Sequence, residues 1–169
     1  SPELEQRLAR IEAQGRTAIV VGEKPGPAAA GRVLGIIAVG DALRAHARDA
    51  VTAWHAAGVR RVVVLRGDNQ RTVDAIAREV GIDEAHGDLL PEDKVAAVQA
   101  LRTTHGSVAM VGDGVNDAPA MATATLGIAM GAAGTDAAIE TADIALMQDD
   151  LRMIAAAVGL GRRTLGIIR

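Results

Sequence analysis

Short apolar runs alternate with stretches of helical periodicity over most of the chain, and this alternation limits the folds that it can adopt. Val62–Leu65 and Val108–Val111 are unbroken apolar runs, which are typical of strands buried on both faces of a sheet. The stretches that separate such runs have apolar residues at helical spacing, and they cover 43–57, 70–80 and 91–102. Strands that alternate with helices predict an α/β fold, a doubly wound parallel sheet with helices on both faces.

The same alternation continues beyond these elements to the end of the chain. It predicts short helices over 117–123 and 135–141, strands over Leu126–Met130 and Asp143–Met147, and a last helix over 151–168.

The first part of the chain has a different pattern. A helix over 3–14 is followed by two apolar strands, Thr17–Val21 and Val33–Val39, whose connection by a loop predicts an antiparallel hairpin. We therefore place a boundary near Gly40. Three parts are expected: an antiparallel part over 1–40, an α/β domain over 41–148, and a terminal helix over 149–169.

Composition excludes several functions. The 169 residues include no Cys, so disulfides, thiolate metal sites and a cysteine nucleophile are excluded. Trp54 is the only aromatic residue and the net charge is −3, which argues against a surface that stacks on nucleic acid. The apolar runs are far shorter than the about 20 residues that span a bilayer, and no signal peptide opens the chain. These features indicate an intracellular, soluble type of chain, long enough for one domain or for one domain and part of another.

The loop after Val111 carries the strongest chemical signal. A predicted strand leads into Gly112-Asp113-Gly114, and Asn116 and Asp117 follow before a short helix. Glycines let the backbone approach a ligand closely, and carboxylate and amide oxygens suit Mg²⁺ together with phosphate. The alternative is a tight turn with Asn116 or Asp117 as N-cap. That alternative explains one acidic residue but not Asp113 between two glycines.

Two further strand ends carry candidate groups. Arg66-Gly67-Asp68-Asn69 leads from a strand into a helix, where backbone amides could cradle a phosphate or where Asp68 or Asn69 could simply cap the helix. Lys94 lies in the first turn of the helix that begins at Pro91, where a cation opposes the helix dipole unless an anion lies nearby. The alternative for Lys94 is a solvated ion pair with Asp93 or Glu92.

These loops resemble the phosphorylation domain of the P-type ATPases, within the haloacid-dehalogenase superfamily. The string GDGVNDAPA, residues 112–120, carries the resemblance most specifically, with Gly67-Asp68-Asn69 and Pro91-Glu92-Asp93-Lys94 before it. Asp41–Arg44 resembles the hinge that enters this domain, and 126–150 resembles the zinc, cadmium and cobalt branch of the heavy-metal transporters.

The resemblance implies a role for each matching residue. Asp113 would coordinate the catalytic Mg²⁺, Lys94 would contact the phosphoryl group, and Asn116 and Asp117 would order the magnesium loop. The nucleotide and phosphate side would be lined by Arg66, Gly67, Asp68, Gly112 and Gly114. The cofactors implied are Mg²⁺ and ATP. The partners implied are the remaining domains of a transporter on the cytoplasmic side of a membrane, and the transported metal would bind outside this segment.

Departures from the family pattern shape the hypothesis. No Asp is followed by Lys-Thr, so the nucleophile motif Asp-Lys-Thr-Gly-Thr is absent, and Arg66 stands where the family usually has Thr. The resemblance therefore implies a segment of an ATP-driven heavy-metal exporter in which 1–40 is the end of a nucleotide-binding domain. We expect the segment alone to form no phosphoenzyme and to leave strand edges open. The alternatives are a soluble phosphatase of the same superfamily, or a non-catalytic truncated remnant.

Overall fold

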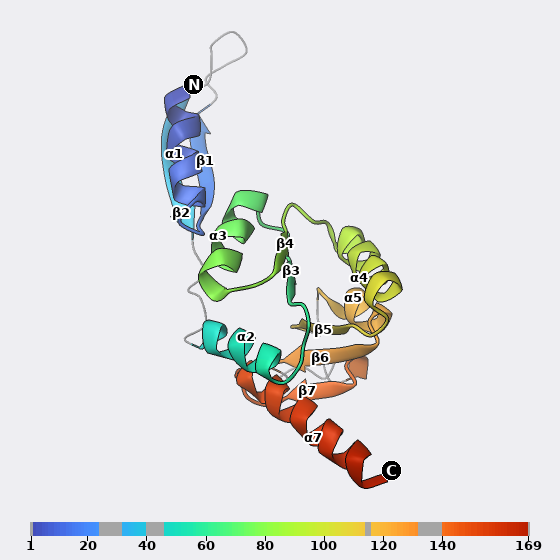
Figure 1. The fold of residues 1–169 in the computed structure, drawn as a ribbon. Coiled ribbons are helices and arrows are strands. Elements are labelled where there is room, and N and C mark those ends of the chain that lie inside the picture. Colours follow the sequence, from blue (N-terminus) through green and yellow to red (C-terminus); the bar gives the residue numbers. More distant parts are fainter. Residues whose placement is uncertain (1, 24–31, 40–45, 114–115, 132–139, 169) are drawn as a thin grey trace. The chain divides into compact units, whose positions relative to one another are not determined.

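The computed structural model describes residues 2–23, 32–39, 46–113, 116–131 and 140–168 (Figure 1). The chain forms two compact units. The first is made of Ser1–Ala45 and Arg61–Asp88, and the second of His46–Arg60 and Leu89–Arg169. Each unit therefore combines two separate stretches of sequence.

The first unit begins with a helix and a hairpin. Helix α1 (Pro2–Glu12) precedes strands β1 (Thr17–Glu23) and β2 (Arg32–Val39), which pair antiparallel with Thr17 opposite Val39. The predicted hairpin is confirmed, although the loop between its strands lies outside the described residues. Large apolar side chains of both strands are exposed, including Ile19 and Ile37, which lie opposite each other.

The second stretch of this unit is a small βαβ segment. Strand β3 (Val63–Leu65), helix α3 (Gln70–Val80) and strand β4 (Glu84–His86) follow in order, and β3 and β4 are parallel. Val73, Ala77 and Val80 are buried at the spacing of one helical face. Strand β4 was not predicted from the sequence.

The second unit is built on three parallel strands in the order β5–β6–β7. These strands are Ala109–Gly112, Leu126–Met130 and Ile144–Leu146. Four helices accompany them among the described residues: α2 (Ala47–Ala56), α4 (Pro91–His105), α5 (Ala118–Thr123) and α7 (Arg152–Ile168). The mixed α/β fold with parallel strands agrees with the predicted class.

Successive residues of β6 show that helices cover both faces of this sheet. Ile128 belongs to a buried cluster with Ile154 of α7, and Trp54 of α2 packs against that cluster. Gly127 faces the other way, because a Cβ added there would lie 3.4 Å from the Cβ of Met121 in α5. Helices α2 and α7 therefore cover one face, and α5 covers the other.

The structure differs from the sequence predictions in strand burial. The runs predicted to be buried on both faces, β3 and β5, are only half-buried and partly exposed. Among the described residues, each has a single neighbouring strand, so one edge stays open, as expected. The predicted helix over 43–57 begins at Ala47 in the structure, and most of the helix predicted over 135–141 lies outside the described residues.

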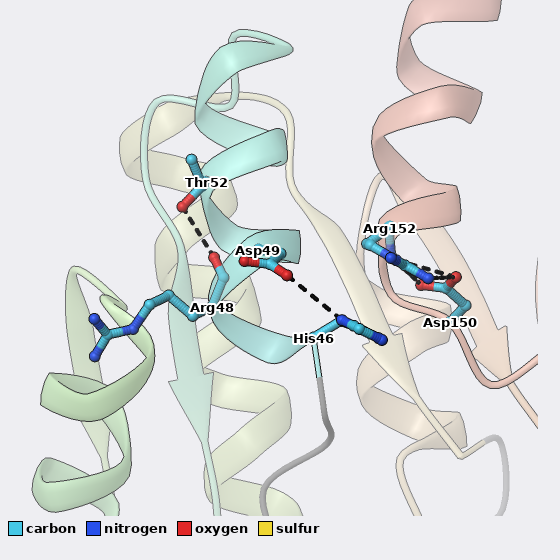
Figure 2. A network of polar contacts seen from close by, with 6 residues as sticks. All are labelled: His46, Arg48, Asp49, Thr52, Asp150 and Arg152. Carbon is cyan, nitrogen blue, oxygen red and sulfur yellow. Dashed lines mark hydrogen bonds and ion pairs between the residues drawn. The ribbon is translucent and has the colours of Figure 1, made fainter.

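Separate polar pairs lie at the starts of α2 and α7 within the second unit (Figure 2). Arg152 donates to both carboxylate oxygens of Asp150, with an Nη2–Oδ2 distance of 2.8 Å. At the start of α2, His46 Nδ1 lies 3.4 Å from Asp49 Oδ2. These hydrogen bonds with Arg152, together with the charges of Arg152 and His46, lower the pKa of Asp150 to about 2.

Helix α7 is rich in glycine beyond its first turns. Gly159, Gly161 and Gly166 each face open space, with no atom within 4 Å of an added Cβ. The Arg162 guanidinium lies against Gly58 beyond the end of α2, where an added Cβ would be 2.7 Å from Nη1. A cation near a helix C-terminus is favourable, and Arg162 lies in that position relative to α2.

The core of the second unit should respond strongly to loss of a buried methionine. Met121 is 1% exposed, so Met121→Ala is expected to lower the free energy of unfolding by about 2–5 kcal/mol. The measurement is denaturant unfolding followed by fluorescence of Trp54, which lies in the same unit. Met147→Ala is the matched control because Met147 is 64% exposed and should change stability by less than about 1 kcal/mol. Equal losses for the two variants would contradict the placement of Met121.

The Asp150–Arg152 pair should make stability depend on pH in acid. Because folding lowers the pKa of Asp150 from 3.8 to about 2, its contribution is present above pH 3.8 and is lost as the pH falls through about 2. Asp150→Asn should therefore lower the thermal midpoint near neutral pH, and the difference from wild type should shrink below pH 3.8. Glu92→Gln controls for the loss of one exposed negative charge. A difference that stays constant across this range would contradict the assignment.

Candidate functional site

The end of β5 brings Gly112 and Asp117 into close contact. A Cβ added at Gly112 would lie 2.7 Å from the Cβ of Asp117 and 2.8 Å from its Oδ2. Asp117 occupies the N-cap position of α5, but its side chain makes no capping hydrogen bond. Oδ1 of Asp117 instead accepts a hydrogen bond from Lys94 Nζ at 2.8 Å. The capping alternative is therefore wrong for the side chain of Asp117.

Lys94 reaches this carboxylate from the first turn of α4. Pro91 begins that helix, and Asp93 Oδ2 accepts the Leu90 N–H at 2.9 Å, which fixes the helix start. Lys94 and Asp117 have side chains that are each 18% exposed. Asp93 thus accepts a hydrogen bond at the helix start, and Lys94 forms its ion pair with Asp117. The anion expected near Lys94 is therefore the carboxylate of Asp117.

Asp113 lies at the exposed end of the same loop. Its Oδ1 accepts the N–H of Asn116 at 3.2 Å, and Gly114 lies outside the described residues. Asp113 and Asp117 give the loop two carboxylates, and Mg²⁺ commonly takes one or two, with water and phosphate oxygens completing its shell. The oxygen donors of this loop are therefore of the type that Mg²⁺ takes. Within the described ranges, no group of three or more His, Asp or Glu side chains is arranged to hold a metal ion.

The loop after β3 is organised around the carboxylate of Asp68. Arg66 Nε donates to Asp68 Oδ2 at 2.7 Å, and Thr17 Oγ1 of β1 donates to Oδ1 at 2.9 Å. These three residues line a small cavity of the first unit. Asp68 therefore ties the loop to β1, a contact that no sequence signal predicted because Thr17 is remote in the chain.

Asn69 begins helix α3 as the capping alternative predicted. Its Oδ1 accepts the N–H of Thr72 at 3.0 Å. Gly67 is exposed between Arg66 and Asp68. The loop thus contains both a helix cap and an exposed glycine. Because the cap uses Asn69 and not Gly67, phosphate binding at Gly67 stays a prediction.

The predicted residues fall into two groups. Lys94, Gly112, Asp113 and Asp117 belong to the second unit, where Lys94 and Asp117 are in direct contact. Arg66, Gly67 and Asp68 belong to the first unit, where Arg66 and Asp68 are in direct contact.

A family profile described as haloacid dehalogenase-like hydrolase matches residues 2–125. The chain belongs to the haloacid dehalogenase-like hydrolases. Residues 126–168, which include β6, β7 and α7, follow the matched region. All of the candidate loops lie within the matched region, residues 2–125.

This haloacid dehalogenase-like chain is similar to parts of longer proteins. It is 46% identical over 169 residues to a probable cadmium-transporting ATPase of Staphylococcus aureus, covering 100% of this chain and 20% of that protein. It is 48% identical over 139 residues to a manganese-exporting P-type ATPase of Mycobacterium bovis, covering 82% of this chain and 19% of that protein. The chain thus spans about a fifth of the length of these curated relatives.

A solved structure shows the same similarity. The crystal structure of a zinc-transporting PIB-type ATPase in the E2.Pi state matches with a TM-score of 0.74 and 44% identity, over 98% of this chain and 26% of that one. Among the described residues of this hydrolase-family chain, no helix is both long and apolar enough to cross a bilayer.

The contact between Gly112 and Asp117 predicts a specific effect of an added methyl group. Gly112→Ala should push Asp117 away from Lys94 and lower the free energy of unfolding by about 1–3 kcal/mol, because the clash is with the near end of the Asp117 side chain. Gly159→Ala is the matched control, since an added Cβ there meets nothing and alanine favours a helix. Denaturant unfolding of both variants checks this. A neutral Gly112→Ala would contradict the tight packing at the end of β5.

Proposed function

We propose that the chain is the part of an ATP-driven, heavy-metal-transporting P-type ATPase that forms the Mg²⁺- and phosphate-binding side of its phosphorylation site. The observation that carries the proposal is the ion pair of Lys94 with Asp117, whose loop also carries Asp113, in a chain that aligns along its full length with a probable cadmium-transporting ATPase. The family membership supports phosphate chemistry, and the names of the relatives support transport of a divalent metal.

Lys94 is the proposed contact for the transferred phosphoryl group. Its ammonium is largely shielded from water and is held at 2.8 Å from Asp117, so its position is defined before any ligand arrives. A fixed cation aimed at the place where negative charge develops stabilises the transition state without reorganisation. Asp117 is the proposed partner that orients Lys94.

Asp113 is the proposed protein ligand for Mg²⁺. Asp113 is exposed, and its carboxylate accepts a hydrogen bond from the Asn116 N–H. When bound, Mg²⁺ offsets the negative charge of the phosphoryl group. Asn116 and the flanking glycines Gly112 and Gly114 are the proposed supports of this loop.

The loop Arg66–Asp68 is the proposed nucleotide and phosphate side. Arg66 is engaged with Asp68 in the structure, which supports a role in shaping the loop as well as adding positive charge. Residues 1–40 are the proposed end of a nucleotide-binding domain, 41–148 the phosphorylation domain, and 149–169 a helix that leads toward a membrane segment. The proposed location is the cytoplasmic side of a membrane, within a full transporter that supplies the aspartyl nucleophile.

The proposal predicts the behaviour of a chimera. In the chimera, the 169-residue sequence replaces the matching segment of the Staphylococcus aureus relative, to which it is 46% identical. The chimera should form an acid-stable phosphoenzyme from radiolabelled ATP. Lys94→Met and Asp113→Asn should each abolish it by removing the phosphate contact and the Mg²⁺ ligand, a loss of about 100-fold or more. Gly159→Ala should retain it. Full phosphoenzyme levels in both site variants would overturn the proposal.

A second measurement uses the 169-residue chain alone and does not depend on the chimera. Titration with Mg²⁺ should shift the amide NMR signals of Asp113 and Asn116, and Asp113→Asn should remove this response while Glu92→Gln keeps it. Turnover of p-nitrophenyl phosphate by the chain alone would favour the soluble phosphatase instead. Absence of any Mg²⁺ response at Asp113 would contradict its assigned role.

A further inference from the structure

Gln70 joins helix α3 to the end of β4 through its side-chain amide. Nε2 donates to Asp74 Oδ1 at 2.7 Å and to the Ala85 carbonyl at 3.0 Å, while Oε1 accepts the Gly87 N–H at 2.6 Å. Both donors and the acceptor of this half-buried amide are therefore used. A surface glutamine at a helix start needs none of these contacts, so the arrangement is specific.

Asp88 completes the connection from the other loop. Its φ of 55° is the only positive value at a non-glycine position in the part of the chain that the structure describes. In this left-handed conformation its N–H donates to the Asp68 carbonyl at 2.6 Å, and its Oδ2 accepts the Gln70 N–H at 3.1 Å. Such a conformation is unfavourable for residues with a Cβ, and Asp tolerates it better than most.

Gly87 lets the two loops touch at their backbones. A Cβ added at Gly87 would lie 2.6 Å from the Gln70 Cα and 2.8 Å from the Asp68 carbonyl oxygen. Gln70, Gly87 and Asp88 thus form one connected group, which we name the loop clasp.

The loop clasp acts on the backbone of Arg66–Asn69. The Arg66 N–H donates to the His86 carbonyl at 2.9 Å, next to the clasp, and the Asp68 carbonyl is held by Asp88. Two backbone groups on either side of Gly67 are therefore fixed, one by His86 at the end of β4 and the other by Asp88 beyond it. The N–H groups of Gln70 and Thr72 are taken by Asp88 and Asn69, so an incoming anion would meet the loop ahead of the helix.

We propose that Gln70 and Asp88 are positioning residues, which hold the Arg66–Asn69 loop in the conformation that receives a phosphate-bearing ligand. The inference rests on the proposed function of that loop. Glycine loses more conformational freedom on ordering than any other residue type. A loop in which Gly67 is ordered in advance therefore binds its ligand with a smaller entropic cost. The hydrogen bonds of the clasp hold Asp88 in its unfavourable left-handed conformation.

Hydrogen exchange of the 169-residue chain tests the positioning. Gln70→Ala removes three hydrogen bonds and should speed exchange of the Arg66 and Asp88 amides by about tenfold or more. The amides of the buried Val73 and Ala77 in α3 should change by less than about twofold, which shows that the helix stays folded. Gln6→Ala, the same substitution at an exposed position of α1, should change neither set.

Variants of Asp88 separate geometry from charge. Asp88→Asn keeps a side-chain oxygen for the Gln70 N–H and tolerates the left-handed conformation, so loop exchange should match wild type. Asp88→Ala lacks the acceptor and disfavours this conformation, so it should behave like Gln70→Ala. Fast exchange in Asp88→Asn would overturn the role assigned to Asp88.

Inorganic phosphate is the ligand probe. The amide NMR signals of Gly67, Asp68 and Asn69 should shift on titration, with an apparent Kd about tenfold weaker in Gln70→Ala. Unchanged loop exchange, or loosened exchange with an unchanged Kd, would each overturn the positioning role. If the wild-type loop shows no response to phosphate, the proposal that Arg66–Asn69 receives a phosphate-bearing ligand is refuted. The Mg²⁺ response of Asp113 then decides separately whether the rest of the proposed function stands.

Discussion

The absence of a side chain at Gly112 governs the arrangement of the second unit's site. Because the backbone at the end of β5 carries no Cβ, Asp117 folds back against it instead of capping α5. That position puts a carboxylate within reach of Lys94 on α4, which β5 separates from α5 in the sequence. Three elements, β5, α4 and α5, are thereby joined at one point. The loop that carries Asp113 starts from the same residue, so its geometry depends on the same close contact.

The sequence predicted most of the fold because most elements are marked by local chemistry. The apolar runs of β3, β5 and β6, the glycine after α3 and the proline that begins α4 all leave local signals. Strand β4 left none: Glu84, Ala85 and His86 are half-buried residues without apolar alternation, and the strand is defined by its pairing with β3. Burial was overestimated for β3 and β5 because an apolar run shows strand propensity and does not show how many neighbours the strand has.

The candidate site was predictable in its residue types and less so in its contacts. Lys94, Asp113 and Asp117 stand out by position at strand ends and helix starts, and the structure brings two of them together. The partner of Lys94 could not be chosen from the sequence, because Asp93 is closer in the chain and has the same side chain as Asp117. Thr17 and Gln70 gave no signal, since each owes its role to a contact with a residue distant in sequence.

The glycines of α7 give that helix two mechanically different parts. Around Ile154 it is held by the core cluster, whereas Gly159, Gly161 and Gly166 add no packing of their own. Each glycine weakens a helix interior by about 1 kcal/mol relative to alanine. The first turns of α7 are therefore secured by the core cluster, whereas from Gly159 onward the helix combines weak intrinsic propensity with little packing by its glycines. Local opening of α7 should accordingly begin in its glycine-containing half while the first turns stay folded.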